Sequence, residues 1–205
     1  MKPLLLVGGG GHARACIDVI EAEGNFEIQG IVERIGGEQA PVLGYPVIGS
    51  DADLAQLLSI TPSALVTVGQ IKSPTARVAL YDLLVELGAR LPSIISPASF
   101  VSKHSTIGEG AIIMHGAIIN ALASVGRNCI VNSQALVEHD AVLGDHCHIS
   151  TGAKVNGGVN IGSSTFIGSG AILREGVNIG ANCVVGAGAT VLHDLPARTQ
   201  FVGLL

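Results

Sequence analysis

Short apolar runs alternate with amphipathic stretches over roughly the first ninety-five residues. The expected strands cover residues 4–7, 28–32, 45–48 and 64–68, and the expected helices cover residues 12–23, 51–58 and 74–87. Gly24 and Gly88 directly follow two of these helices, where glycine commonly ends a helix. Alternation of strands and helices predicts a small parallel sheet flanked by helices, which is a Rossmann-like βαβ domain of the α/β class.

The rest of the chain follows another rule, because one aliphatic residue recurs every six positions from Val101 onward. A period of six fits neither an α-helix nor a two-faced strand, and it is typical of an all-β parallel β-helix of hexapeptide repeats. Three repeats complete one triangular coil, and the aliphatic residue points inward. The series comprises Val101, Ile107, Ile113, Ile119, Val125, Val131, Val137, Leu143, Ile149, Val155, Ile161, Ile167, Leu173, Ile179, Val185 and Val191.

This change of pattern divides the chain into residues 1–96 and 97–205. The narrow interior of such a prism explains why only 3% of the residues are aromatic. A net charge of −5 without a run of basic residues argues against a nucleic-acid partner. The uncharged stretch 111–126 is short and contains His115 and Asn120, so no membrane insertion is expected. Four cysteines without a secretion signal indicate a reducing, cytoplasmic location.

Three cysteines fall on the small-residue position of the repeat, four residues after an inward aliphatic residue. Cys129, Cys147 and Cys183 are spaced by multiples of 18, so they stack in one column together with Thr165. Neighbouring coils lie about 4.8 Å apart, which makes a Cys129–Cys147 disulfide geometrically conceivable. Cysteine also serves as a small apolar residue, and this is the preferred interpretation. One straight column cannot surround a zinc ion, and no metal is expected.

A glycine-rich segment lies between the first expected strand and the first expected helix. Residues 8–13 fit the pattern G-x-G-x-x-A, and Glu33 follows about twenty residues later at the end of the second strand. Glycines there let the backbone approach a phosphate, and the helix N-terminus favours an anion. A domain of fewer than 100 residues has room for half a dinucleotide fold, so the pattern predicts a mononucleotide site, with a tight structural turn as the alternative.

The segment Glu138-His139-Asp140 is the strongest candidate for chemistry in the prism. His139 lies two residues after the inward Val137, so its side chain is expected outside the core. A histidine between two carboxylates suits general-base catalysis, because a carboxylate partner fixes the tautomer and raises the basicity of the imidazole. His146 is expected to be a solvated turn residue, as are His104, His115 and His193.

Three segments of the sequence resemble a known family: residues 4–20 (LLLVGGGGHARACIDVI), 93–102 (SIISPASFVS) and 130–162 (IVNSQALVEHDAVLGDHCHISTGAKVNGGVNIG). They are similar to left-handed β-helix acyltransferases of the sialic-acid O-acyltransferase type, which include N-acetyltransferases of UDP-4-amino sugars in bacterial glycan pathways. The resemblance implies a left-handed β-helix, acetyl-CoA as co-substrate, and a homotrimer with active sites between subunits. It also assigns residues 1–96 to a nucleotide sugar and residues 97–205 to acyl transfer.

The resemblance further implies roles for individual residues. His139 would take the proton from the sugar amine or hydroxyl during direct transfer, and Asp140 would orient it. Related enzymes often have a second acidic residue at the position of Arg34. This difference puts the contact that those enzymes make with uridine in doubt for this sequence. Cofactor contacts are implied for His148, Gly157, Ser169 and Ala187, and substrate contacts for Gly11, His12, Glu33, Arg34, Gly69 and Asn132.

Three other functions stay open. The same His139 could serve a sugar O-acetyltransferase of the sialic-acid type. A γ-type zinc carbonic anhydrase shares the prism fold, but His139, His146 and His148 lie within about half a coil, which is not the spacing of a three-histidine site. A catalytically silent nucleotide-sugar-binding scaffold is the last alternative. The sequence stops at Leu205, where related enzymes continue into a segment that caps the CoA end, so either the sequence is truncated there or this cap is missing.

Overall fold

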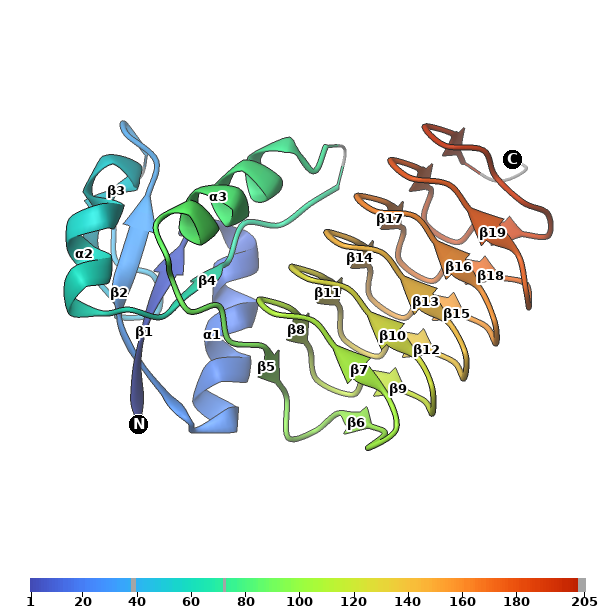
Figure 1. Ribbon diagram of the computed structural model, residues 1–205, viewed down its shortest axis with the longest axis horizontal. Coiled ribbons are helices and arrows are strands. Elements are labelled where there is room, and N and C mark those ends of the chain that lie inside the picture. The colour runs from blue at the N-terminus through green and yellow to red at the C-terminus, as the bar shows by residue number, and fades with distance from the viewer. Residues whose placement is uncertain (38–39, 72, 203–205) are drawn as a thin grey trace.

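The computed structural model describes residues 1–37, 40–71 and 73–202. It has a βαβ domain at one end and a long prism of stacked coils at the other, with the last described residues at the far tip of the prism (Figure 1). Both parts of the predicted fold are confirmed. The final residues 203–205, on which the expected loss of a CoA-end cap depends, lie outside the described residues.

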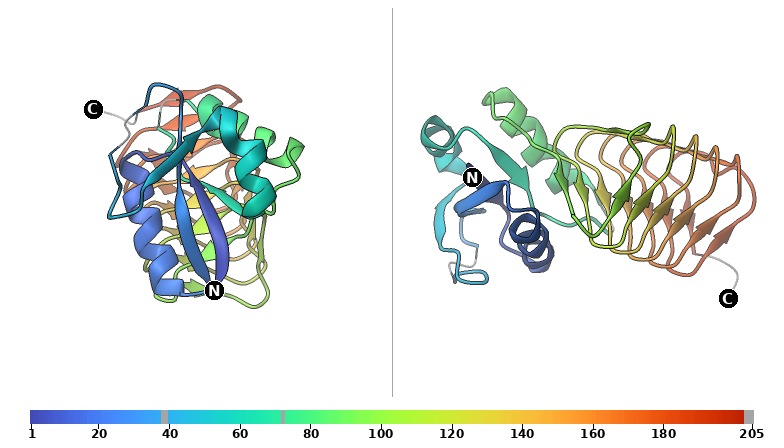
Figure 2. Two further views of the ribbon diagram at one scale, coloured as in Figure 1. Left: turned by 90° about the vertical axis from the view of Figure 1, so that its left-hand side faces the viewer. Right: turned by 90° about the horizontal axis from the view of Figure 1, so that it is seen from below.

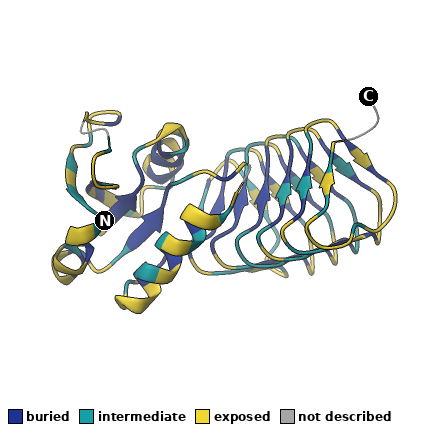
Figure 3. Ribbon diagram, turned by 90° about the horizontal axis from the view of Figure 1, so that it is seen from above, coloured by how far each residue is buried: buried dark blue, intermediate teal, exposed yellow. Residues whose placement is uncertain are grey.

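Four parallel strands form the sheet of the N-terminal domain, in the order β3-β2-β1-β4. They are β1 (Lys2–Val7), β2 (Phe26–Glu33), β3 (Val47–Ser50) and β4 (Ala64–Val66). α1 (Gly11–Glu23) packs on one face through Cys16, Ile17 and Ile20, as the apolar spacing predicts. α2 (Leu54–Ile60), preceded by the 3-10 turn η1 (Asp51–Asp53), and α3 (Thr75–Glu86) cover the other face. The sheet is buried between exposed outer helix surfaces (Figure 3).

Two elements of this domain differ from the prediction. The strand expected at 45–48 lies at Val47–Ser50, and the helix expected at 51–58 begins as a 3-10 turn. Ser50 and Asp53 form a capping box there, which fixes the start of the turn. Gly24 ends α1 in the left-handed conformation (φ 72°), and its N–H donates to the carbonyl of Ile20, as expected of a glycine C-cap.

The prism has three faces, each a parallel sheet of two-residue strands (Figure 2). We call them the docked face, the apolar face and the polar face. The docked face comprises β5 (Ile94–Ile95), β8 (Ile112–Ile113), β11 (Ile130–Val131), β14 (His148–Ile149), β17 (Phe166–Ile167), β20 (Val184–Val185) and β22 (Gln200–Phe201). The apolar face comprises β6 (Phe100–Val101), β9 (Ile118–Ile119), β12 (Leu136–Val137), β15 (Lys154–Val155), β18 (Ile172–Leu173) and β21 (Thr190–Val191). The polar face comprises β7 (Thr106–Ile107), β10 (Ser124–Val125), β13 (Val142–Leu143), β16 (Asn160–Ile161) and β19 (Asn178–Ile179).

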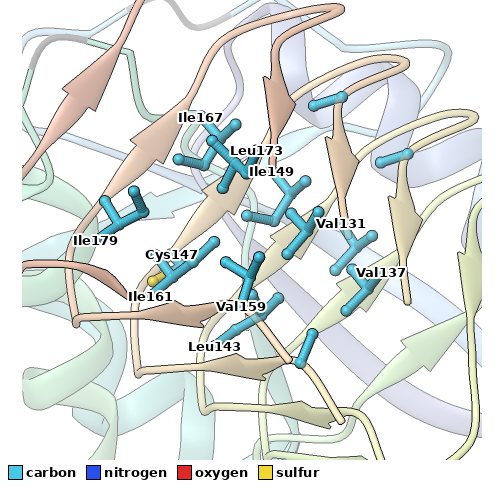
Figure 4. Close-up of a cluster of buried hydrophobic side chains, with 14 of the residues drawn as sticks. Val131, Val137, Leu143, Cys147, Ile149, Val159, Ile161, Ile167, Leu173 and Ile179 are labelled. Carbon is cyan, nitrogen blue, oxygen red and sulfur yellow. The ribbon is translucent and has the colours of Figure 1, made fainter. Parts of the chain in front are cut away.

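The six-residue series fills the interior of the prism. Its members from Ile113 to Val191 are all buried, and Val101 and Ile107 pack against them at the N-terminal end of the prism. Figure 4 shows several of these side chains meeting at the prism axis. The first strand is β5, which pairs with β8, so the prism begins at Ile94 rather than at the expected residue 97.

The cysteine column is a ladder of hydrogen bonds rather than a disulfide. All four cysteines are free and buried. The Cys129 thiol donates to the carbonyl of Gly144 at 3.2 Å, Cys147 repeats this contact one coil later, and the Thr165 hydroxyl continues it to Gly180 at 2.9 Å. Each small polar group therefore satisfies a carbonyl of the following coil, which favours residues with one short donor at this position.

The N-terminal domain sits on the first coils of the docked face. Ile94, Ile112 and Ile130 point out of the prism into the same buried cluster as Ile17 and Ile20 of α1. This apolar contact joins the two parts. None of the described helices is both long and apolar enough to cross a membrane.

Candidate active site

The His139 side chain lies at the corner where the apolar face turns into the polar face, directly after β12. Its Nδ1 atom lies 2.8 Å from Oδ2 of Asp140, and both side chains are more than half exposed. This hydrogen bond is the main reason why the pKa of His139 is raised above its ordinary value of 6.5. If Nδ1–H donates to Asp140, Nε2 carries the free lone pair, which is the arrangement a general base needs.

The turn geometry explains why Asp140 reaches back to His139. Asp140 has a positive φ of 60°, and Asn128 has φ 52° at the equivalent position of an earlier turn. Asp and Asn tolerate this conformation better than most residues. Asp140 supplies the hydrogen bond to the imidazole, and the charge of Glu138 adds a smaller contribution to the raised pKa of His139. Oε2 of Glu138 accepts the His139 backbone N–H at 3.1 Å and the Asn120 amide at 2.8 Å, so it fixes the backbone of the turn.

Gly157 lies beside the His139 ring on the next coil. A Cβ built on Gly157 would come within 2.8 Å of Cε1 and 2.9 Å of Nε2 of His139. Any residue other than glycine at this position would therefore displace the ring. The N–H of Gly158 donates to the His139 carbonyl at 3.0 Å and ties the two coils together. Among the hydrogen bonds of the described residues, none uses the Gly157 N–H, which leaves a free donor next to the imidazole.

His148 has a different environment, on the docked face under the N-terminal domain. It is buried, with Nδ1 2.6 Å from the Gln70 carbonyl and Nε2 3.3 Å from the Asn132 amide. The ring of His12 lies 6.3 Å away between centroids. Burial, followed by the positive charge of Arg77, lowers the pKa of His12 to about 3, and burial also lowers the pKa of His148 to about 4. Both imidazoles are therefore neutral at physiological pH.

A second corner, between the docked and apolar faces, holds Ser169 and Ala187, which are expected to contact the cofactor, and Asn132, which is expected to contact the substrate. Asn132 lies there, and Ser169 lies two coils further along, with its hydroxyl 2.9 Å from that of Ser150. Ala187 is exposed one coil beyond Ser169. Because these residues repeat at one corner, they follow the prism axis as a continuous edge.

A pocket of about 860 Å³ opens at the carboxyl end of the N-terminal sheet, and its size suits a small-molecule ligand. Gly11, His12, Glu33, Arg34 and Gly69 all line it, so the structure brings together every substrate residue predicted for this domain. The two Glu33 carboxylate oxygens accept the backbone N–H groups of Gly9 at 2.7 Å and of Arg34 at 3.0 Å. Glu33 thus braces the glycine loop against the end of β2.

Within one chain, this pocket and the His139 pair lie on opposite sides of the prism. The N-terminal domain rests on the docked face, whereas His139 lies at the corner opposite that face. Asn132 belongs to the corner between the docked face and the apolar face. The predicted site residues therefore form two separate groups, one at the His139 corner and one around the pocket and the Asn132 corner.

Comparison with known proteins identifies the family. The sequence matches the PglD N-terminal domain over residues 3–79 and the bacterial transferase hexapeptide (six repeats) over residues 158–193. The acetyltransferase domain of PglB from Neisseria gonorrhoeae FA1090 is 32% identical, with 97% of this chain and 95% of that chain covered and a TM-score of 0.89. The chain belongs to the PglD-type hexapeptide-repeat acetyltransferases. The family expected from the sequence is confirmed.

Two further structures of these acetyltransferases bear on the ligands. PerB from Caulobacter crescentus, solved in complex with CoA and GDP-perosamine, is 36% identical, with 96% of this chain and 92% of that chain covered and a TM-score of 0.88. The PglB domain has also been solved in complex with acetyl coenzyme A, at 32% identity, with 96% and 94% covered and a TM-score of 0.86. No curated protein matches the sequence.

Arg77 on α3 is the main residue of this acetyltransferase that the sequence did not reveal. Its buried guanidinium donates to the carbonyls of Val66 at 3.1 Å and Val68 at 2.9 Å, and twice to the carbonyl of Asn128 in the prism. Burial lowers its pKa to about 10, so it stays charged. It joins the pocket wall to the prism through main-chain carbonyls, which no sequence pattern marks.

The expectation for His146 was wrong. It is not a solvated turn residue, because its ring lies against Tyr81 with centroids 5.4 Å apart and its Nδ1 lies 3.0 Å from the Asn128 amide. His139 and His146 lie at two different corners of the prism, and His148 lies on the docked face. Within the described part of the chain, no group of three or more His, Cys, Asp or Glu residues could hold a metal ion.

Proposed function

We propose that this chain transfers the acetyl group of acetyl-CoA to the amine of a nucleotide-linked amino sugar, with His139 as general base. The observation that carries this proposal is the His139–Asp140 pair beside the free N–H of Gly157. The family supports the same activity, since PerB binds CoA and GDP-perosamine and PglB binds acetyl coenzyme A. The pocket at the glycine loop supplies a place for the nucleotide.

The chemistry follows from the positions of these groups. The thioester supplies an activated acetyl group. The sugar amine attacks its carbonyl carbon, Nε2 of His139 takes the amine proton as the C–N bond forms, and Asp140 stabilises the resulting imidazolium. The N–H of Gly157 is positioned to donate to the oxyanion that develops beside the ring. When the C–S bond breaks, His139 returns the proton to the leaving thiolate, so no covalent enzyme intermediate is needed.

The proposed site needs two copies of the chain, because one chain separates His139 from its own pocket. The apolar face supports such an assembly, because Phe100 and Ile118 point outward from it and are 58% and 40% exposed. Leu136 and Ile172 continue this stripe, with the exposed Lys154 between them. The face is flanked by the His139 corner on one side and the Asn132 corner on the other. Packing three apolar faces around an axis would set the His139 corner of one copy beside the Asn132 corner of the next.

The activity is tested by CoA release with a panel of UDP-, GDP- and dTDP-linked amino sugars, together with sialic acids as O-acetyl acceptors. His139→Ala should lower kcat by about 10²–10⁴-fold with the true acceptor. The control is His104→Ala, an exposed histidine on the same prism. Acetyl transfer by His139→Ala at the wild-type rate would show that His139 is not the base.

Subunit complementation tests whether the site is shared between copies. Gly10→Glu would place a carboxylate where the diphosphate is expected, in open space that needs no repacking. Gly10→Glu and His139→Ala should each be inactive alone. Co-expressed in equal amounts, they should recover about a quarter of the wild-type activity, because random mixing pairs an intact His139 with an intact pocket in one site of four. No recovery in mixed oligomers would mean that each site lies within one chain. The mass in solution should be three times the 20.8 kDa of the chain.

A further inference from the structure

Two charged side chains line the nucleotide pocket beyond the glycine loop. Arg34 directly follows β2, and Asp51 directly follows β3. These strands are parallel neighbours, and Glu33 pairs with Ser50 in register at their ends. Arg34 and Asp51 therefore leave adjacent strands at the same level, about one strand spacing of 4.8 Å apart.

Neither side chain is engaged elsewhere. Over the described residues, the ion pairs are Arg127–Asp145 and His139–Asp140, and no hydrogen bond uses the Arg34 guanidinium or the Asp51 carboxylate. Glu33 differs, because both of its carboxylate oxygens already accept backbone N–H groups. Arg34 and Asp51 are thus the charged groups free to read a ligand at this end of the pocket.

The backbone around Arg34 keeps its side chain beside the pocket. Residues 34–37 form a turn in which the N–H of Gly37 donates to the Arg34 carbonyl at 2.8 Å. A Cβ built on Gly37 would lie 3.1 Å from Cγ of Arg34, so the stem of this exposed side chain runs past the turn. The guanidinium is left to bind.

The order of the strands gives the direction of a bound nucleotide. The glycine loop follows β1, Arg34 follows β2 and Asp51 follows β3, and these three strands are consecutive in the sheet. With the phosphates at the N-terminus of α1, the ribose crosses the end of β2. The base then reaches the region between Arg34 and Asp51, one to two strand spacings or about 5–10 Å from β1.

The guanidinium of Arg34 and the carboxylate of Asp51 together match guanine better than the other bases. Guanine presents O6 and N7 as adjacent acceptors, which suit a bidentate arginine, and N1–H and the 2-amino group as adjacent donors, which suit a carboxylate. Uracil and thymine have no N7 and no amino group, so they offer each side chain at most one partner. Adenine and cytosine place an amino group where guanine has O6, which would face the arginine donors.

We infer that Arg34 and Asp51 select guanine, so that the amino sugar is carried by a guanosine diphosphate. This inference rests on the proposed function for the nature of the ligand, and it adds the base and the two residues that recognise it.

Equilibrium binding of nucleoside diphosphates to the full chain tests the inference. Wild type should bind GDP about tenfold or more tightly than UDP. Inosine diphosphate lacks only the 2-amino group and should bind more weakly than GDP. Asp51→Asn should reduce the preference for GDP over inosine diphosphate, because the amide oxygen accepts the 2-amino group without the charge of the carboxylate, and Arg34→Met should reduce the preference for GDP over UDP. The matched controls are Asp18→Asn and Arg90→Met, which change exposed side chains outside the pocket.

Several outcomes would overturn the inference. Equal or tighter binding of UDP than of GDP by the wild type contradicts it, while acetyl transfer to another nucleotide sugar stands. Equal weakening of GDP and UDP by both substitutions would show that Arg34 and Asp51 act on the phosphates or the ribose instead of the base. If no nucleoside diphosphate binds, the inference and the nucleotide-linked acceptor of the proposed function fail together.

Discussion

Adding one methyl group at Gly157 should displace the proposed base without disturbing the fold. A Cβ at this position would lie 2.8 Å from Cε1 of His139, whereas ordinary carbon contacts are about 3.5–4.0 Å. The ring must therefore move by about 0.7 Å or more. His139 is exposed and can move, and the φ of Gly157 lies outside the left-handed region. We expect Gly157→Ala to change the free energy of unfolding by less than about 0.5 kcal/mol.

The effect on catalysis should be much larger. A displacement of this size moves Nε2 off the line of the attacking amine and strains the contact with Asp140. Misplacing a catalytic group by about 1 Å costs roughly 10²-fold, so we expect kcat to fall about 10–100-fold. The N–H of residue 157 remains in the variant, so the loss would come from the position of His139 and not from a missing oxyanion donor.

Thiol release measures kcat, and thermal unfolding measures stability. The control is the same substitution in a His139→Asn background, where no ring is left to displace and no further loss is expected. A Gly157→Ala enzyme with kcat within twofold of wild type would refute the steric reasoning. An equal loss in the His139→Asn background would show that the methyl group acts on a substrate rather than on His139.

Three further predictions follow from the charges. Asp140→Asn keeps the turn but removes the hydrogen-bonded carboxylate, so the pKa of His139 should fall and the acid limb of the kcat/KM profile should move to lower pH; an unmoved limb contradicts this. Arg77→Lys keeps the charge but loses the fork, and should lower the free energy of unfolding in urea by about 2–4 kcal/mol, whereas an unchanged value would mean that the carbonyl contacts are not stabilising. His12 and His148 have pKa values of about 3 and 4, below the ordinary 6.5, so the unfolded chain binds more protons and stability should fall from pH 6.5 towards 4. The slope is up to about 1.4 kcal/mol per pH unit for each of these two histidines, and His148→Asn should make it shallower by removing the contribution of His148.

The prism could be predicted because its contacts are periodic. A residue meets its neighbours 18 positions away, so the six-residue spacing alone gives both the inward column and the cysteine column. The same six-residue spacing extends back to the first strand of the prism, because Ile95 lies six residues before Val101 and belongs to β5. The expected boundary at residue 97 overlooked this member of the series.

The junction between the two parts could not be predicted in the same way. Arg77 binds carbonyls of Val66, Val68 and Asn128, and main-chain acceptors carry no residue signature. Gln70 likewise acts through its carbonyl, which lies 2.6 Å from the ring of His148. Only the three-dimensional packing of α3 and the loop after β4 on the docked face brings these atoms together.

Two histidines nine residues apart show how their surroundings decide a chemical role. His139 is exposed and bound to a carboxylate, so its pKa is raised and its free nitrogen can accept a proton. Burial, together with the nearby charge of Arg77, lowers the pKa of His148 and opposes its protonation, although the hydrogen bond to the Gln70 carbonyl acts in the opposite direction. Proton transfer is therefore expected at His139, and His148 can only offer neutral hydrogen bonds. Because Gln70 holds the ring of His148, any ligand that touches this ring is positioned by the N-terminal domain as well as by the prism.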